Sequence, residues 1–178
     1  MAESDEPDDL YVERVLGEDL GAMAVLAERY YPSVYRFGFK LGRNEHDAQD
    51  IAQETFLRAA RNLRNYVPGT QFKSWLFGIA VNVSREMARK NRSHECIDSP
   101  EALQYAEIPA SSHGLEDRFG MALRSLSVEE RSAVVLVYEH ELNHREAARV
   151  CGCAESTISW RLFLAKRKLK KWMERHER

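Results

Sequence analysis

The stretch from Leu142 to Lys171 constrains the fold more than any other part of the chain, because it combines a short capped segment, a glycine and a long amphipathic segment. Asn143 followed three residues later by Glu146 has the form of a capping box and predicts the start of a helix. Gly152 supplies the left-handed backbone conformation that ends such a helix. The pattern predicts a helix-turn-helix, whose second helix fits the DNA major groove. An ordinary helical hairpin with a solvated basic face is the alternative.

The longer helix of this stretch has two different sides. Apolar residues recur at the spacing of one helical stripe that packs on a core. These residues are Ile158, Leu162, Ala165, Leu169 and Trp172. A second set lies on the opposite side: Ser156, Trp160, Phe163, Leu164, Arg167 and Lys171. An apolar and basic outward side on a helix that already has a core side indicates a binding partner.

Charge is unevenly distributed along the 178 residues, although the formal net charge is only −2. Residues 1–20 contain eight acidic residues and one basic residue, Arg14, whereas residues 156–178 contain eight basic and two acidic residues. This asymmetry indicates nucleic-acid binding at the basic end. Residues 1–17 are nearly free of large apolar residues up to Leu10, so we predict an acidic tail that is disordered or loosely docked.

Several classes of protein are excluded by what the sequence lacks. No apolar run approaches the roughly 18 residues of a membrane span, and the acidic N-terminus is unlike a signal peptide, so we expect a cytoplasmic protein without membrane insertion. No Ser/His/Asp set, P-loop or metal cluster is present, so we expect no catalytic residue, metal or cofactor, and no enzyme activity.

The cysteines fit a reducing compartment, because Cys96, Cys151 and Cys153 are three in number and have no framework spacing. Cys151 and Cys153 near His144 leave a zinc or redox site as an alternative. We favour the simpler interpretation, in which buried cysteine behaves as a small hydrophobic residue.

The rest of the chain shows helical periodicity and no strand alternation, so we predict an all-α fold. A helix from Asp19 to Leu41 contains Pro32, which predicts a kink or two abutting helices. The next helix, residues 47–63, has a polar side opposite its apolar side. Acidic residues on this polar side precede basic ones at helical spacing. Ion pairs within a solvent-exposed helix therefore explain the polar side without a binding partner.

A third long helix is predicted after Thr70, a plausible N-cap. Its core stripe comprises Phe72, Leu76, Ile79, Val83 and Met87. Asn82, Arg85 and Arg89 follow one line on another side, and the preceding loop contains aromatic residues. Arginines beside aromatics form a second candidate nucleic-acid surface, with a solvated basic face as the alternative.

Residues 93–117 contain no Lys or Arg, six acidic residues and two prolines, and are predicted to be a flexible linker. Beyond it, Ser127 and Glu130 form another capping box, which opens a helix apolar on nearly all sides. The predicted architecture is therefore two small helical domains, residues 18–92 and 118–178, joined by an acidic linker.

Two separated blocks resemble the extracytoplasmic-function (ECF) group of bacterial RNA polymerase sigma factors, in the sigma-70 superfamily. DAQDIAQETFLRAARNLRNYVPGTQFKSWLFGIAVNVSREMARK, residues 47–90, is similar to their second region. LSVEERSAVVLVYEHELNHREAARVCGCAESTISWRLFLAKRKL, residues 126–169, is similar to their fourth region. Their order, the acidic linker between them and the total length also fit this group.

The resemblance implies an alternative-type sigma factor that binds the β and β′ subunits of core RNA polymerase and directs promoter-specific initiation. It would recognise the −35 and −10 elements of promoter DNA, melt the −10 region, and be held by an anti-sigma factor. The implied polymerase-binding residues are Asp47, Asp50, Gln53, Glu54 and Arg58. The implied −10 contacts are Tyr66, Phe72, Asn82, Arg85 and Arg89. The implied −35 contacts are Ser156, Thr157, Ser159, Trp160, Arg161, Phe163, Lys166 and Arg167.

The fourth region departs from the family at the positions that would read DNA. Family members often carry a basic residue where Ser159 stands, a small one at Trp160 and a basic one at Leu164. We therefore expect Trp160, Phe163 and Leu164 to contact thymine methyl groups or sugars, with basic residues on phosphates.

Two other interpretations are compatible with parts of the sequence. A free-standing helix-turn-helix regulator would explain the C-terminal half but not residues 47–90, and it would need a dimerisation surface, of which no coiled-coil pattern is seen. A sigma mimic that sequesters an anti-sigma factor without touching DNA would not need Arg85, Arg89 or the basic C-terminal helix.

Overall fold

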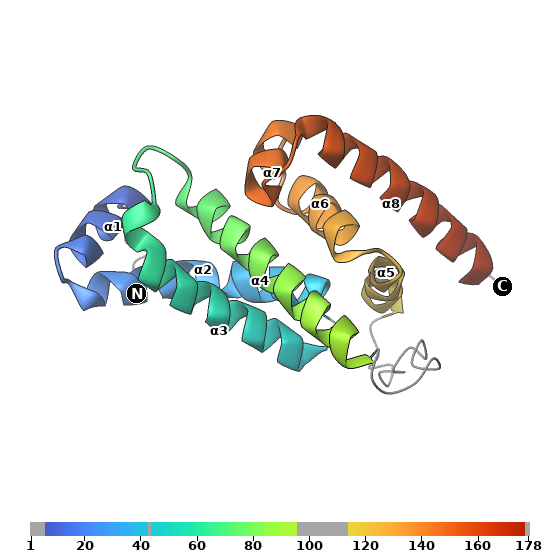
Figure 1. Ribbon diagram of the computed structural model, residues 1–178, viewed down its shortest axis with the longest axis horizontal. Helices are drawn as coiled ribbons and strands as arrows, with labels where there is room; N and C mark the ends of the chain where they lie inside the picture. The colour runs from blue at the N-terminus through green and yellow to red at the C-terminus, as the bar shows by residue number, and fades with distance from the viewer. Residues whose placement is uncertain (1–5, 43, 96–113, 177–178) are drawn as a thin grey trace. The chain divides into compact units, whose positions relative to one another are not determined.

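A computed structural model describes residues 6–42, 44–95 and 114–176, in which every regular element is a helix. The all-α prediction is therefore confirmed. The helices are α1 (Asp8–Leu16), α2 (Leu20–Leu41), α3 (Glu45–Asn62), α4 (Phe72–Glu95), α5 (Gly114–Arg124), α6 (Val128–Tyr138), α7 (His144–Cys151) and α8 (Glu155–His176), with a 3-10 turn at Leu63–Asn65 (Figure 1). They form two compact units, Met1–Val83 and Ser84–Arg178. None of the described helices has the length and apolar content needed to cross a membrane.

The N-terminal unit is built on close packing of α2 against α3. Gly38 makes this possible, because a Cβ there would lie 3.0 Å from the carbonyl oxygen of Ala48 and 3.2 Å from Ile51 Cγ2. Phe37 and Phe77 meet in the core with ring centroids 5.0 Å apart. The unit therefore buries large aromatic side chains between helices whose backbones approach closely.

The acidic N-terminal segment is helical, so the prediction of a disordered tail is wrong for residues 8–16. Tyr11 and Val12 on α1 are 2% and 1% exposed. Asp8, in the first turn, accepts hydrogen bonds from Arg29 Nη1 at 2.6 Å and the Tyr30 hydroxyl at 2.5 Å. Acidic side chains at a helix N-terminus stabilise the helix, and these find partners on α2.

Pro32 lies inside α2, which continues without interruption from Leu20 to Leu41 and is not two helices. Leu26, which precedes the proline, and Val34 and Phe37, which follow it, are fully buried. Proline removes one backbone hydrogen bond, and this packing on both sides of it keeps the helix intact. Asp19 caps α2 through a hydrogen bond from the Gly21 amide at 3.0 Å.

The ends of α4 and α5 differ from the prediction. Thr70 does not cap α4; its hydroxyl donates to the Val67 carbonyl at 2.6 Å and closes the preceding turn. Helix α4 extends to Glu95 and α5 begins at Gly114, so both ends of the predicted linker are helical. The rest of the predicted linker, residues 96–113, lies outside the described residues.

The C-terminal unit contains the predicted helix-turn-helix. Both predicted capping boxes are confirmed, with Ser127 and Glu130 at the start of α6 and Asn143 and Glu146 at the start of α7. Gly152 ends α7 with φ 62°, as predicted. Helix α6 is buried from Glu130 to Leu136 and forms the core on which α7 and α8 pack.

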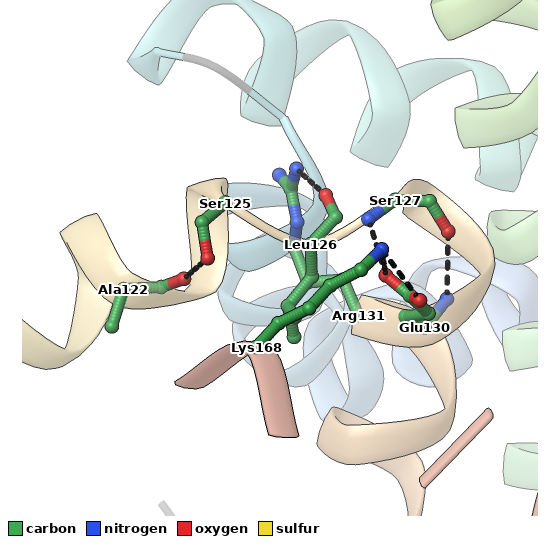
Figure 2. Close-up of polar contacts among 7 residues, drawn as sticks. All are labelled: Ala122, Ser125, Leu126, Ser127, Glu130, Arg131 and Lys168. Atoms are coloured by element: carbon green, nitrogen blue, oxygen red, sulfur yellow. Dashed lines mark hydrogen bonds and ion pairs between the residues drawn. The ribbon is translucent and has the colours of Figure 1, made fainter. Parts of the chain in front are cut away.

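Glu130 joins this core to α8 (Figure 2). Its carboxylate accepts the capping hydrogen bond from the Ser127 amide at 2.9 Å and pairs with Lys168 Nζ at 2.7 and 2.8 Å. Beside it, Arg131 Nη2 donates to the Leu126 carbonyl at 3.0 Å. The angle at which α8 leaves the core is therefore fixed by a charge pair in addition to apolar packing.

Candidate nucleic-acid and partner interfaces

The outward side of α8 exposes two aromatic rings. Trp160 and Phe163 are 58% and 50% exposed, whereas Ile158 and Leu162 on the inward side are 0% and 4% exposed. The two outward rings stack with centroids 5.5 Å apart at an interplanar angle of 25°. The Arg167 guanidinium lies 5.7 Å from the Phe163 centroid. The predicted orientation of α8 is confirmed. Its outward side presents two stacked aromatic rings with the Arg167 guanidinium beside them, which we call the Trp160–Phe163 ladder.

Ser159 lies beside these two rings and connects α8 to the first residue of α7. Its hydroxyl oxygen is 3.0 Å from His144 Nδ1, and it donates to the Glu155 carbonyl at 3.3 Å. Ser156, Ser159, Trp160 and Phe163 line one shallow, open concavity. Two serine hydroxyls beside two exposed rings suit the edge of a base pair, which offers hydrogen-bonding groups and methyl groups.

The basic residues of α8 divide into outward and inward ones. Lys166 and Arg167 are exposed, with Lys166 Nζ 5.5 Å from the Tyr138 ring centroid. Arg161 is half-buried, with Nη1 3.5 Å from Cys153 Sγ, and Thr157 is also half-buried. Lys168 faces Glu130 (Figure 2). The cations best placed for phosphate contacts are therefore Lys166 and Arg167.

The polar side of α3 faces solvent and is partly self-paired. Glu54 Oε1 and Arg58 Nε are 2.6 Å apart, and His46 Nε2 lies 3.7 Å from Asp50 Oδ2. Asp47 lies at the capped start of the helix, and Gln53 is exposed. The five predicted polymerase-binding residues therefore share one helix and remain accessible in part.

Exposed apolar residues on α3 and, in the other unit, on α5 were missed in the sequence. Leu57 is 51% exposed, four residues after Gln53 on the same side of α3. On α5, Phe119 and Met121 are 51% and 53% exposed. Leu57 could have been identified from the sequence, because it is an apolar residue at a helical position that otherwise carries polar residues. Exposed apolar groups rimmed by polar ones mark protein contacts.

Tyr66 and Phe72 are buried in the core in this conformation, and their role at the −10 element stays a prediction. They are 5% and 1% exposed. The two rings meet edge to face at 5.5 Å, and Phe72 also lies 5.6 Å from the Tyr30 ring. The aromatic residues at this end of the bundle fill its core. The loop between them presents Val67, which is 63% exposed, and Gln71.

The loop is held from α1 by Asp9. Its carboxylate oxygens lie 2.6 Å from the Tyr66 hydroxyl and 2.7 Å from the Gly69 amide nitrogen, which donates to it. The hydrogen bond from Tyr66, followed by that from Gly69, lowers the pKa of Asp9. Burial, followed by the hydrogen bond to Asp9, raises the pKa of Tyr66 to about 12. No sequence pattern links two residues separated by 57 positions.

The polar line on α4 is partly accessible. Asn82 and Arg89 are exposed, and Arg85 is half-buried.

Cys151 is buried, which raises the pKa of its thiol, and Cys153 is half-buried. Among the residues that the structure describes, no three His, Cys, Asp or Glu side chains gather as a metal site. Cys96 lies outside those residues.

Comparison with known families assigns both blocks. Sigma-70 region 2 matches residues 26–94, and Sigma-70, region 4 matches residues 116–169. The ECF RNA polymerase sigma factor SigE of Mycolicibacterium smegmatis is 32% identical over 184 residues, covering 97% of this chain and 70% of the relative. The ECF RNA polymerase sigma factor EcfG of Rhodopseudomonas palustris is 36% identical over 140 residues, covering 78% and 77%.

Solved structures show the same fold. The sigma factor RpoE of Bartonella quintana, in complex with the anti-sigma factor NepR, aligns with a TM-score of 0.69 at 29% identity over 83% of this chain and 94% of that one. CnrH, in complex with the cytosolic domain of CnrY, has a TM-score of 0.71 at 22% identity over 95% and 98%, a likeness of fold alone. With both sigma regions matched in order and relatives of this similarity, the chain belongs to the ECF RNA polymerase sigma factors.

Proposed function

We propose that this chain binds core RNA polymerase and directs initiation at promoters whose −35 and −10 elements it recognises. The observation that carries the proposal is the ordered pair of sigma-70 regions, the second of which exposes the Trp160–Phe163 ladder on its recognition helix. Residues 18–92 would serve the −10 element and residues 118–178 the −35 element, with residues 93–117 between them. The activity is that of an initiation factor in the cytoplasm and involves no catalytic step of its own.

At the −35 element, α8 would enter the major groove with its outward side. Trp160 and Phe163 offer apolar area for thymine methyl groups, while Ser156 and Ser159 offer hydroxyls to base edges. Lys166 and Arg167 would contact phosphates, which position the helix without selecting a sequence. This arrangement favours an A·T-containing −35 element over one read mainly through guanine.

At the −10 element, the accessible residues replace the buried aromatics. Val67 and Gln71 in the loop, with Asn82 and Arg89 on α4, are the side chains able to meet unpaired bases and their phosphates. Arginine contacts to the backbone suit single-stranded DNA, because they do not require a particular base.

Protein partners would use the remaining surfaces. The polar side of α3, together with Leu57, is the proposed contact for a large subunit of polymerase, and Phe119 and Met121 offer an apolar contact in the second unit. In one of the two solved complexes, the sigma factor RpoE is bound to the anti-sigma factor NepR. We infer an anti-sigma factor as a partner of this chain as well.

The test is transcription with purified components. The chain is mixed with core polymerase and a genomic promoter library, and the 5′ ends of the transcripts are sequenced. We expect starts that share −35 and −10 motifs and are absent with core polymerase alone. A Trp160→Ala variant should change which −35 sequences are used. Transcripts without promoter-specific starts would refute the proposal.

A further inference from the structure

Two neighbouring carboxylates in the first turn of α1 have different tasks. Asp8 binds Arg29 Nη1 and the Tyr30 hydroxyl, both on α2, at 2.6 and 2.5 Å. Asp9 instead binds the Tyr66 hydroxyl and the Gly69 amide at 2.6 and 2.7 Å. Asp8 therefore attaches α1 to the helical bundle, whereas Asp9 attaches α1 to the loop that precedes α4.

The loop has few other constraints. Within it, the Thr70 amide and hydroxyl donate to the Val67 carbonyl at 3.2 and 2.6 Å. Gly69 adopts φ 79°, a left-handed conformation that glycine enters and leaves easily, and nothing lies within 4 Å of where its Cβ would be. The Tyr66 hydroxyl also approaches the Thr70 carbonyl, so its single proton is shared by two acceptors. The buried Tyr66 ring anchors one end of the turn in the core, and Asp9 of α1 holds the Gly69 amide within the turn.

Both oxygens of the Asp9 carboxylate are used, one on each end of the turn. Hydrogen bonds to an ionised acceptor are roughly twice as strong as neutral ones. Together they fix the direction in which the exposed tip, Val67 and Pro68, projects. A loop ordered before its ligand arrives does not lose that conformational freedom on binding, which favours affinity and selectivity.

We propose that Asp9 is a positioning residue for −10 recognition, holding the 66–71 loop in the conformation that receives an unpaired base. The proposal rests on the proposed function, in which this loop meets the −10 element. It also assigns a role to the acidic N-terminal segment, which otherwise contacts neither polymerase nor DNA in the scheme above. Asp9 acts through the loop backbone and does not itself touch DNA.

The experiment uses holoenzyme made from the full chain and core polymerase, on a promoter identified by the transcription test. Transcript yield is compared between that promoter and copies with single substitutions in the −10 or the −35 element. The variants are Asp9→Ala, Asp9→Asn and Tyr66→Phe. Asp8→Ala is the matched control, because it weakens the attachment of α1 without touching the loop.

We expect Asp9→Ala to reduce discrimination among −10 bases roughly tenfold, the size of a lost base contact, while −35 discrimination stays unchanged. Asp9→Asn should retain part of the selectivity, because its amide oxygen still accepts from Gly69. Tyr66→Phe keeps the buried ring and should show an intermediate loss. Asp8→Ala should lower the melting temperature and leave −10 discrimination at the wild-type value.

Two results would overturn the proposal. In one, Asp9→Ala and Tyr66→Phe retain wild-type −10 discrimination, whatever their stability. In the other, Asp8→Ala reduces discrimination as much as Asp9→Ala, which would mean that α1 acts only by stabilising the bundle. Failure of the proposed function looks different, because wild-type holoenzyme would then show no −10 preference before any variant is made.

Discussion

At the scale of single residues, the exposed rings of α8 are the least expected feature of the chain. Trp160 and Phe163 keep half or more of their surface in water although Leu162 and Ala165 between and beside them are buried. The exposed part of each ring does not stabilise the fold, since burial is what does so. We therefore propose that the rings serve recognition.

The first prediction concerns Trp160→Ala. Promoter-dependent transcription should fall roughly tenfold, as for one lost base contact, while the free energy of unfolding changes by less than about 0.5 kcal/mol. Leu162→Ala is the control on the buried side and should cost about 2–5 kcal/mol. Thermal unfolding and run-off transcription measure the two quantities. A large loss of stability in Trp160→Ala would show that the ring is a core residue.

The second prediction is a pH dependence caused by Tyr66. A tyrosine whose pKa rises on folding contributes stability that is complete below the ordinary pKa of 10.0 and is lost as pH rises towards about 12. Between pH 9 and 11 the wild type should lose roughly 1 kcal/mol more stability than Tyr66→Phe. Burial also raises the pKa of Tyr30, so only the difference between the two proteins is diagnostic. Parallel curves would contradict the raised pKa of Tyr66, which burial causes first and the hydrogen bond to Asp9 second.

Residue positions on helices could be predicted from the sequence, whereas the burial of loop residues could not. Ile158, Leu162 and Ala165 are buried as their spacing predicted. The resemblance assigned Tyr66 and Phe72 to −10 contacts, although helical spacing also placed Phe72 in the core stripe of its helix, where it is buried. The position of Tyr66 depends on Asp9, which is distant in sequence, and no local pattern contains that information.

At the scale of helices, the capping residues do more than begin each element. Glu130 caps α6 and binds Lys168 of α8, and Asn143 and Glu146 cap α7 in the same way. A buried carboxylate needs both hydrogen bonds and a counter-charge, and Glu130 has both. Polar contacts therefore help to hold the helix-turn-helix on α6. From the sequence, only the capping role of these residues could be predicted.

The third prediction separates these two roles of Glu130. Glu130→Ala should destabilise the protein by roughly 2 kcal/mol, about half from the lost cap and half from the ion pair. Glu130→Gln keeps an acceptor for the Ser127 amide and should cost about 1 kcal/mol, as should Lys168→Met. Urea unfolding measures all three. Equal losses in Glu130→Ala and Lys168→Met would show that the cap contributes little.

The ends of helices were predicted correctly where capping residues mark them. They were predicted poorly where tertiary contacts determine whether a segment is helical. Both capping boxes and the Gly152 stop were correct. Helix α1 was missed because its composition is acidic, and composition does not show that Asp8 meets Arg29. The extent of α2 was predicted, but the choice between one helix and two at Pro32 depends on the packing around it, which a local rule does not include.

At the scale of the whole molecule, a net charge of −2 conceals a basic C-terminal helix and an acidic N-terminal one. The free chain has little overall attraction to DNA, and each recognition surface is small. Binding both surfaces to polymerase raises their effective concentration on the promoter, so neither needs high affinity alone. Specific binding is therefore a property of the holoenzyme.

The fourth prediction follows from this division. Fluorescence anisotropy should show that the free chain binds a promoter duplex at least about a hundredfold more weakly than the holoenzyme does at the same salt concentration. Arg167→Ala should weaken holoenzyme binding across sequences and reduce the salt dependence by about one counterion. Tight, sequence-selective binding by the free chain would instead identify a free-standing regulator.

The anchoring of α8 through Glu130 and Lys168 has a consequence for how such proteins diversify. The residues that hold the helix in place face inward, and those that would meet DNA face outward, so stability and sequence preference depend on different positions. A duplicated gene can therefore acquire a new promoter preference through substitutions at a few outward positions while its product still folds. Inheritance of a new regulon then requires no redesign of the scaffold.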